Sequence, residues 1–135
     1  MAKPLKLTYL KASLEDKSGA LLEVLRKLKS KNLGLLGLWA YGVADGKTEL
    51  YLIPKNPEKV KNALQASGEL VNEGTGLWIK GTDKAGALLK PLEAAANAGI
   101  NIVVTHALAV GGKFGSFFRV APEDVDKMSR ALGAK

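Results

Sequence analysis

Asp16-Lys17-Ser18-Gly19-Ala20-Leu21-Leu22 is repeated, with one substitution, as Asp83-Lys84-Ala85-Gly86-Ala87-Leu88-Leu89. The offset from residue 16 to residue 83 is 67 residues, about half of the 135-residue chain. At the same offset, Asn32-Leu33-Gly34-Leu35 aligns with Gly99-Ile100-Asn101-Ile102. A repeat of this length indicates two similar structural units. We therefore predict one repeat over residues 1–73 and a second over residues 74–135.

Each repeat is near the lower size limit for a self-sufficient hydrophobic core. The two repeats are therefore expected to pack together rather than to move independently on a linker. Functional residues are expected at the junction between them.

Hydrophobic periodicity predicts the order strand, helix, strand, strand, helix in each repeat. A split β-α-β plan follows, which is the ferredoxin-like α+β fold with an antiparallel sheet and helices on one face. Asp16 or Ser18 is predicted to cap the first helix. Asp45-Gly46 is predicted to form a tight hairpin turn. The second repeat has no room for a last strand, which leaves a sheet edge that a neighbour could cover. The first repeat is predicted to have strands at 5–14, 35–43, 48–53 and 69–72 and helices at 20–28 and 57–66. The second is predicted to have strands at 77–80, 100–110 and 116–120, a helix at 87–98 and a last helix from residue 122.

Composition excludes several classes of protein. The chain is 47% hydrophobic and 24% charged, which is typical of a globular domain. It has no apolar run of the roughly 18 residues that span a bilayer, and no signal-peptide stretch, so a cytoplasmic protein without a membrane partner is expected. The absence of cysteine excludes disulfides, thiolate catalysis and thiolate metal sites.

The net charge of +7 is unevenly distributed along the sequence. Residues 1–67 hold 12 Lys or Arg and 6 Asp or Glu, whereas residues 68–135 hold 8 and 7. A solvated helix face is the favoured interpretation, while anionic ligands, membranes and nucleic acid remain open as minor alternatives. The excess is concentrated at Arg26, Lys27, Lys29, Lys31, Lys55, Lys59 and Lys61.

At the repeated segments the chain resembles the ACT domain family, small regulatory modules that bind amino acids. The family pattern is a strand, a loop of the form Asp-Arg-Pro-Gly-Leu-Leu, a helix, and Gly-Ile-Asn-Ile at the next strand. The chain departs from it at Ser18 and Ala85, which replace the loop proline, and at Gly34, which replaces the asparagine. The resemblance implies a stand-alone, non-catalytic, homodimeric regulator without a cofactor. Its partners would be a small amino acid at the junction between units and a regulated enzyme.

The resemblance also implies a set of ligand-binding residues. Loop glycines would let backbone N–H groups approach the ligand carboxylate, and loop aspartates would accept hydrogen bonds from its ammonium group. Asn101 would bond the ligand through its amide. The alternative is that these residues only cap helices, form turns and end a strand. The candidate set is Asp16, Gly19, Ala20, Asp83, Gly86, Ala87, Leu88, Asn101 and Ile102.

Other chemistry has weak support in the sequence. His106 is the only histidine, and we expect it to be a hydrogen-bonded strand residue between the repeats rather than a catalytic base. Its counterpart Trp39 is expected on one face of a strand with Tyr41. The segment 113–120 resembles the third strand of RNA-recognition domains, but Ser116 replaces a stacking aromatic, so Phe114 and Phe118 are interpreted as packing residues. No nucleotide loop or metal-ligand spacing is present, and a docking module without a small-molecule ligand remains the alternative function.

Overall fold

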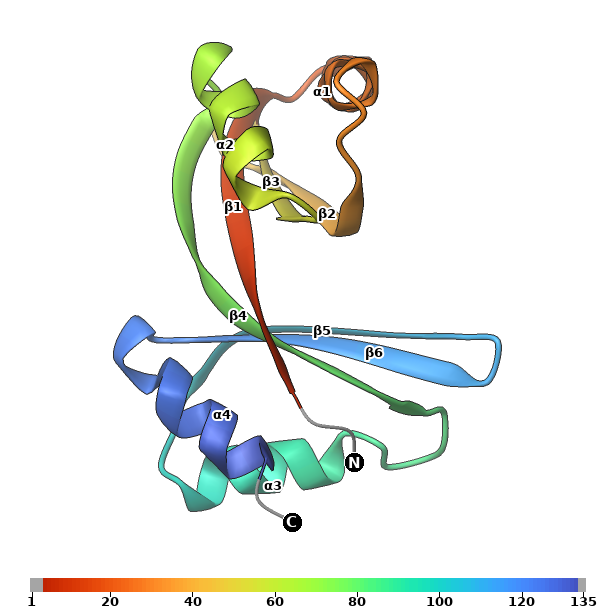
Figure 1. The fold of residues 1–135 in the computed structure, drawn as a ribbon, viewed down its shortest axis with the longest axis vertical. Coiled ribbons are helices and arrows are strands. Elements are labelled where there is room, and N and C mark those ends of the chain that lie inside the picture. The colour runs from red at the N-terminus through yellow and green to blue at the C-terminus, as the bar shows by residue number, and fades with distance from the viewer. Residues whose placement is uncertain (1–3, 134–135) are drawn as a thin grey trace. The chain divides into compact units, whose positions relative to one another are not determined.

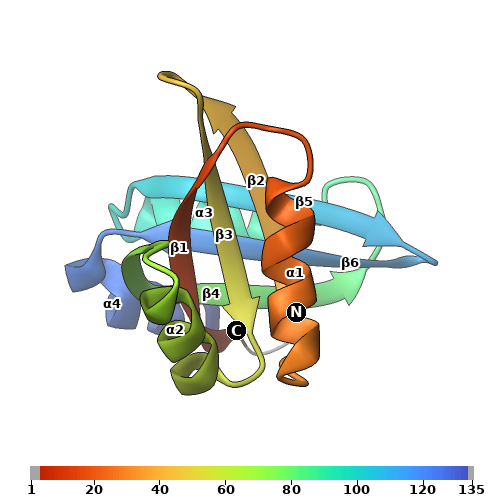
Figure 2. The same ribbon diagram turned by 90° about the horizontal axis from the view of Figure 1, so that it is seen from above.

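The computed structural model describes residues 4–133, and its elements follow the predicted order twice (Figures 1 and 2). The predicted α+β class is confirmed. The six strands are β1 (Leu5–Glu15), β2 (Leu35–Val43), β3 (Lys47–Pro54), β4 (Leu70–Thr82), β5 (Ile102–Val110) and β6 (Lys113–Val120). The helices are α1 (Ala20–Ser30), α2 (Pro57–Ala66), α3 (Leu89–Asn97) and α4 (Val125–Gly133), and a 3-10 turn, η1 (Pro122–Asp124), precedes α4.

The chain divides into two compact units, and the division cuts two strands. The first unit is Thr8–Gly74, and the second combines the chain up to Leu7 with the chain from Thr75 onward. The first unit has the strand order β2-β3-β1-β4, and the second has the order β1-β4-β6-β5. The hairpins β2–β3 and β5–β6 are antiparallel, as are the pairs β1–β3 and β4–β6.

Strand β4 replaces two predicted strands. The segments 69–72 and 77–80 are parts of one strand of 13 residues, so the predicted boundary between residues 73 and 74 falls inside it. Within the second repeat, as far as residue 133, no strand follows β6, as predicted. The start of β1 stands in that position within the second unit, where Lys6 forms an ion pair with Asp126 on α4.

The first unit has a core between its sheet and its two helices. Residues 5–14 form a strand, as predicted, and along β1 every second side chain is buried at Leu10, Ala12 and Leu14. α1 contributes Val24 and Leu28 to this core. α2 begins with Pro57 at its first position, and its N-cap Asn56 accepts a hydrogen bond from the Lys59 N–H at 3.2 Å.

The second unit repeats this arrangement with different side chains. Leu77 and Ile79 on β4 are fully buried, together with Phe118 on β6. α4 contributes Met128 and Leu132, which are also fully buried. Phe118 is thereby confirmed as a packing residue.

Several local predictions are confirmed and others are wrong. Asp45 and Gly46 both have φ of +66°, as the predicted tight turn requires. α1 is capped by Gly19 without a side-chain hydrogen bond, so the predicted caps at Asp16 and Ser18 are wrong. Pro122 opens the 3-10 turn rather than the α-helix itself.

The helix predicted from Ala87 begins two residues later, at Leu89. Pro91 has no N–H, so it cannot donate to the Ala87 carbonyl as a regular helix requires. A tighter turn forms instead, in which the Leu89 N–H donates to the Gly86 carbonyl at 3.0 Å.

Candidate functional site

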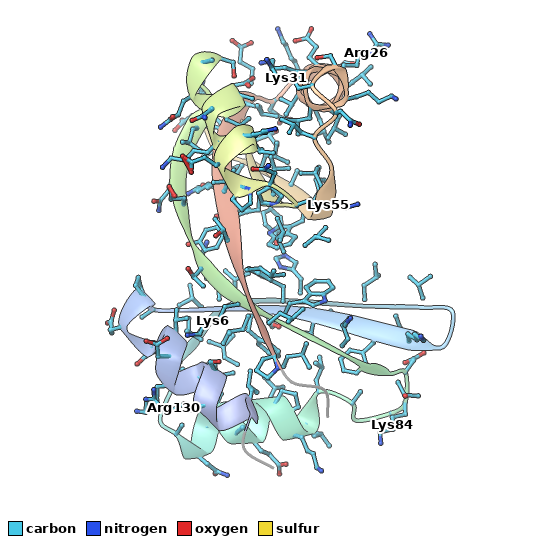
Figure 3. The ribbon with its side chains drawn as sticks, viewed as in Figure 1. Lys6, Arg26, Lys31, Lys55, Lys84 and Arg130 are labelled. Carbon is cyan, nitrogen blue, oxygen red and sulfur yellow. The ribbon has the colours of Figure 1, made fainter. Side chains whose placement is uncertain are left out.

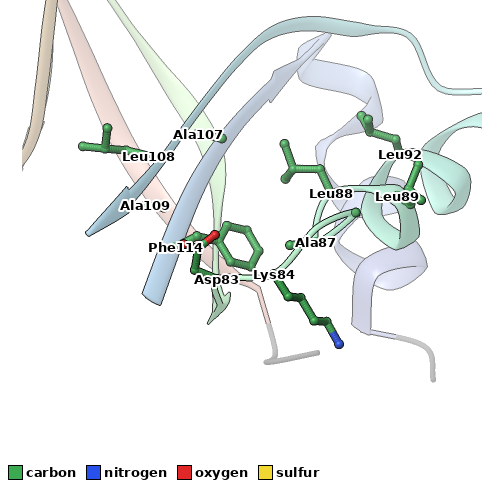
Figure 4. A pocket seen from close by; sticks show the side chains of 11 residues that line it. Asp83, Lys84, Ala87, Leu88, Leu89, Leu92, Ala107, Leu108, Ala109 and Phe114 are labelled. Atoms are coloured by element: carbon green, nitrogen blue, oxygen red, sulfur yellow. The ribbon is translucent and has the colours of Figure 1, made fainter. Parts of the chain in front are cut away.

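A pocket of about 370 Å³ lies in the second unit beside the repeated loop (Figure 4). Its floor and walls come from the loop after β4, the start of α3, the end of β5 and one residue of β6. The lining residues are Asp83, Lys84, Gly86, Ala87, Leu88, Leu89, Leu92, Ala107, Leu108, Ala109 and Phe114.

Strand register explains why there is space here. Ala107 pairs with the buried Ser116, and Ala109 pairs with Phe114, so both alanines lie on the helix-covered face of β5. Their small side chains leave the end of this face unfilled. The loop is held next to it by a hydrogen bond from the Asp83 N–H to the Gly112 carbonyl at 2.9 Å.

The corresponding loop of the first unit has a similar backbone but a different aspartate environment. The Asp16 N–H donates to the Gly46 carbonyl at 2.8 Å, which matches the Asp83 contact. The Asp16 carboxylate, however, accepts a hydrogen bond from the Thr48 hydroxyl at 3.1 Å. A Cβ atom at Gly42 would lie 3.5 Å from the other carboxylate oxygen. Asp16 is therefore engaged within its own unit.

Phe114 occupies in the second unit the position that Thr48 occupies in the first. Thr48 pairs with Leu14 and Gly42, and Phe114 pairs with the residues 67 positions later, Gly81 and Ala109. A phenyl ring offers Asp83 no hydroxyl. Within residues 4–133 we find no side-chain hydrogen bond or ion pair of Asp83.

The pocket combines three kinds of chemical group. The Asp83 carboxylate can accept hydrogen bonds from an ammonium group. The N–H groups of Gly86 and Leu88 precede α3 and have no hydrogen-bond acceptor among the described residues, so they can donate to a carboxylate. Apart from Lys84, the remaining walls are alanine, leucine and phenylalanine side chains, which suit an apolar group.

Some predicted ligand residues line this pocket and others do not. Asp83, Gly86, Ala87 and Leu88 line it. Asp16 is bonded to Thr48, Gly19 is the cap of α1, and Ala20 packs against the first core. The contribution of all these residues to ligand binding stays a prediction.

Asn101 and Ile102 lie away from the pocket lining. Gly99 has φ of +70° after α3, and the Ile100 N–H donates to the Ala95 carbonyl at 2.9 Å, so β5 begins only at Ile102. Asn101 is thus exposed and outside the strand, contrary to the sequence prediction. Ile102 packs against the second core.

The sequence prediction does not include the other lining residues, which are Lys84, Leu89, Leu92, Ala107, Leu108, Ala109 and Phe114. The β5–β6 hairpin connection is one residue shorter than the β2–β3 connection. The repeat offset therefore falls from 67 to 66 after the hairpin, and Phe114 aligns with Thr48 rather than with Lys47. Phe114 was interpreted only as a packing residue, whereas it also forms a wall of the pocket.

The aromatic residues of the first unit form a cluster around Tyr51. Its ring lies 5.9 Å from that of Trp39 and 6.3 Å from that of Tyr41, so the predicted common face of Trp39 and Tyr41 is confirmed. Burial lowers the pKa of His106, in the second unit, below its ordinary value.

Residues 4–133 contain neither a metal-binding cluster nor a membrane-spanning helix. These residues include no group of three or more histidine, aspartate or glutamate side chains that could hold a metal ion. No helix in the same range is long and apolar enough to cross a membrane.

The division into compact units changes the distribution of charge. Thr8–Gly74 contains 10 Lys or Arg and 8 Asp or Glu, a net charge of +2, whereas the rest of the chain contains 10 and 5, a net charge of +5. Glu69 and Glu73, at the end of the first unit, pair with Lys27 and Lys61. The larger excess thus belongs to the second unit, where Lys84 is exposed beside the pocket (Figure 3).

Solved structures with the same fold include a protein of Bacteroides thetaiotaomicron, BT0572. It is 27% identical, with a TM-score of 0.84 over 97% of this chain and 89% of that one. The regulatory subunit of aspartate kinase from Thermus thermophilus is 18% identical, with a TM-score of 0.71 over 97% of this chain and 93% of that subunit. The corresponding subunit from Thermus flavus is 17% identical, with a TM-score of 0.63 over 97% of this chain and 95% of that subunit. No protein-family model matches the sequence, and no curated protein matches it. These likenesses span nearly the whole chain and confirm the predicted type of fold.

Proposed function

We propose that this chain, which has the ACT-like fold, is a non-catalytic regulatory protein that binds a small amino acid beside Asp83. The proposal depends above all on one observation, the difference between the two loops. Asp16 is bonded by Thr48, whereas Asp83 lines an open pocket in which Phe114 replaces that threonine. Of the two copies, only the second loop has a carboxylate ready for a ligand ammonium group.

The pocket supports an amino acid with an apolar side chain. Asp83 would accept from the ammonium group, and the backbone N–H groups of Gly86 and Leu88 would donate to the carboxylate. Leu92, Ala107 and the other apolar walls would contact the side chain. A few polar groups combined with largely apolar walls are the usual composition of a small-molecule site.

A homodimer is the second part of the proposal. Leu89 and Leu108 at the pocket rim are 63% and 73% exposed, and the neighbouring Val110 is 71% exposed. Large apolar side chains grouped in this way are typical of an interaction surface. A second copy placed over this rim would remove water from the bound amino acid and strengthen its polar contacts.

Action on an enzyme is the third part. The two Thermus relatives are regulatory subunits of aspartate kinase, and at their level of identity they support the fold of this chain rather than its partner. Association with an enzyme would be tested by co-purification from the source cells with and without the amino acid.

Calorimetry of the dialysed protein against each of the twenty amino acids tests the ligand. We expect binding of one or a few apolar amino acids, with affinity reduced about tenfold or more in Asp83→Ala because a charge-assisted hydrogen bond is lost. Asp16→Ala serves as the matched variant of the first loop and is expected to change affinity by less than about twofold.

Two results would contradict the proposal. If no amino acid binds, and an enzyme still co-purifies, the chain is a docking module without a small-molecule ligand. If Asp16→Ala abolishes binding and Asp83→Ala does not, the binding loop has been assigned to the wrong repeat.

A further inference from the structure

A second cavity, of about 590 Å³, lies in the same unit and shares part of its wall, including Phe114 and Lys84, with the Asp83 pocket. We call it the lysine groove. It runs between the end of β4 and the first turns of α3. Its polar lining residues are Lys80, Thr82, Lys84, Lys90 and Glu93, and the others are Gly81, Gly86, Ala87, Leu89 and Phe114.

The groove carries an excess of positive charge. Three ammonium groups, from Lys80, Lys84 and Lys90, are accompanied by one carboxylate, that of Glu93. None of these three lysines forms an ion pair within residues 4–133. Elsewhere in that range Lys11 and Lys61 lie 3.2 Å and 2.6 Å from carboxylates. Unpaired cations gathered around a concave surface raise the local concentration of anions.

The local sequence keeps the groove open. A Cβ atom at Gly81 would lie 2.6 Å from the Phe114 ring, so the missing side chain lets this ring lie against β4. Gly81 separates Lys80 and Thr82 along the strand. The ring thereby lines both the groove and the Asp83 pocket.

The first repeat provides an internal comparison. At the offset of 67, the residues Lys80, Thr82, Lys84 and Lys90 correspond to Ser13, Glu15, Lys17 and Glu23. Glu93 corresponds to Arg26, and with this pair included the net charge of the five positions is +2 in the second repeat and 0 in the first. Lys17 is also paired, since its ammonium lies 3.6 Å from the Glu15 carboxylate. The cationic groove is therefore specific to the second copy and does not follow from the fold.

We propose that the lysine groove binds a small organic anion with two or more negative charges, either a phosphate ester or a dicarboxylate. Lys80 and Lys90 contact the anion from β4 and α3, and the Thr82 hydroxyl donates a further hydrogen bond. The groove adjoins the site proposed for an amino acid, and the two cavities share five lining residues: Lys84, Gly86, Ala87, Leu89 and Phe114. Lys80 and Lys90 line only the groove, and Asp83 lines only the pocket.

Titration of the full chain with glycerol 3-phosphate and with succinate, at constant ionic strength, tests this proposal. Calorimetry gives the affinity, and amide chemical shifts in NMR locate the site. We expect saturable binding with shifts at residues 80–93. The double variant Lys80→Ala/Lys90→Ala should weaken binding about tenfold or more, because two charge-assisted contacts are lost. Binding of glycerol 3-phosphate alone identifies the phosphate ester, and binding of both identifies a general dianion site.

The matched control is Lys47→Ala/Lys127→Ala, which removes two exposed lysines outside the groove. It should change affinity by less than about twofold. Equal weakening by the control, or no saturable binding of either anion, overturns the proposal. Asp83→Ala should not weaken anion binding, so failure of the amino acid site and failure of the groove are distinguishable.

Discussion

Two aspartates at the same loop position differ because one hairpin connection is a residue shorter than the other. Because the β5–β6 connection is shorter, Phe114 occupies the strand position that Thr48 occupies in the first unit. Asp16 is consequently bonded to a hydroxyl, and Asp83 is available to solvent. A one-residue change in a turn thus decides which copy of a repeated loop can accept a ligand.

Replacing Thr48 with valine tests the structural role of the first loop. Thr48→Val keeps the shape of the side chain but removes the donor to Asp16. We expect a loss of about 0.5 kcal/mol in the free energy of unfolding, at the low end for a hydrogen bond because the pair is exposed. Urea unfolding measures it. Thr82→Val, where no side-chain hydrogen bond is found within residues 4–133, should have a smaller effect, and an equal effect would contradict the assignment.

His106 predicts a pH dependence of stability. Burial lowers the pKa of its imidazole in the folded state, so the unfolded chain binds more protons once the pH falls below the ordinary value of about 6.5. The contribution is fully present above that value and is lost as the pH falls through the folded-state pKa. Melting temperatures measured from about pH 7.5 to about pH 5 should therefore decrease.

His106→Gln is the control for this effect. His106 is the only histidine of the chain, so the variant should lose most of the decrease between about pH 7 and about pH 5. An unchanged decrease in the variant would show that carboxylates, and not His106, are responsible.

At the scale of elements, β4 and β6 are fitted to each other through a glycine and an aromatic ring. Gly81→Ala should push the Phe114 ring away from β4, since the added Cβ atom would overlap it. We expect a loss of about 1–3 kcal/mol in the free energy of unfolding, as for other overpacked sites. Denaturant unfolding measures it. Gly133→Ala, where an added Cβ meets nothing within 4 Å, should be nearly neutral, and equal losses would argue against the fit.

Elements with a strong local pattern could be predicted from the sequence, and their ends could not. The strand β1 and the turn at Asp45-Gly46 are predicted correctly because each depends on neighbouring residues. α3 begins later than predicted because Pro91 lacks an N–H group. β5 begins later than predicted because the chain leaves the preceding helix at Gly99, which has a positive φ. Asn101 was placed on a strand because its neighbours are apolar and β-branched, a pattern that does not mark where pairing begins.

The candidate site was predictable only in part for a similar reason. The loop Asp83–Leu88 is visible as a repeat in the sequence. The walls at Ala107 and Phe114 join the loop through strand pairing, which depends on hairpin length. The lysine groove combines residues of β4 and α3 that no motif connects.

At the scale of the whole molecule, the second unit depends on residues at the start of the chain. A chain that begins at Thr8 would lack the part of β1 that belongs to this unit. We expect faster amide hydrogen exchange in the second half of β4 and in β6, because an exposed strand edge opens more readily. Exchange in the core of Thr8–Gly74 should change much less.

A chain that begins at Leu5 retains all of β1 and is the control for that truncation. Its exchange should match that of the full chain in both units. Unchanged protection of β4 and β6 in the shorter chain would show that the start of β1 does not stabilise the second unit.

The insertion of one unit between two parts of the other has a consequence for the order of folding. Joining Leu7 to the strand after Gly74 requires closure of a loop the length of the first unit, Thr8–Gly74. For an unstructured loop of that length the entropic cost is about 4 kcal/mol. Once the first unit has folded, β1 and β4 already lie next to each other, and most of that cost has been met. The second unit is therefore expected to fold after the first, and a substitution that slows folding of the first should delay both.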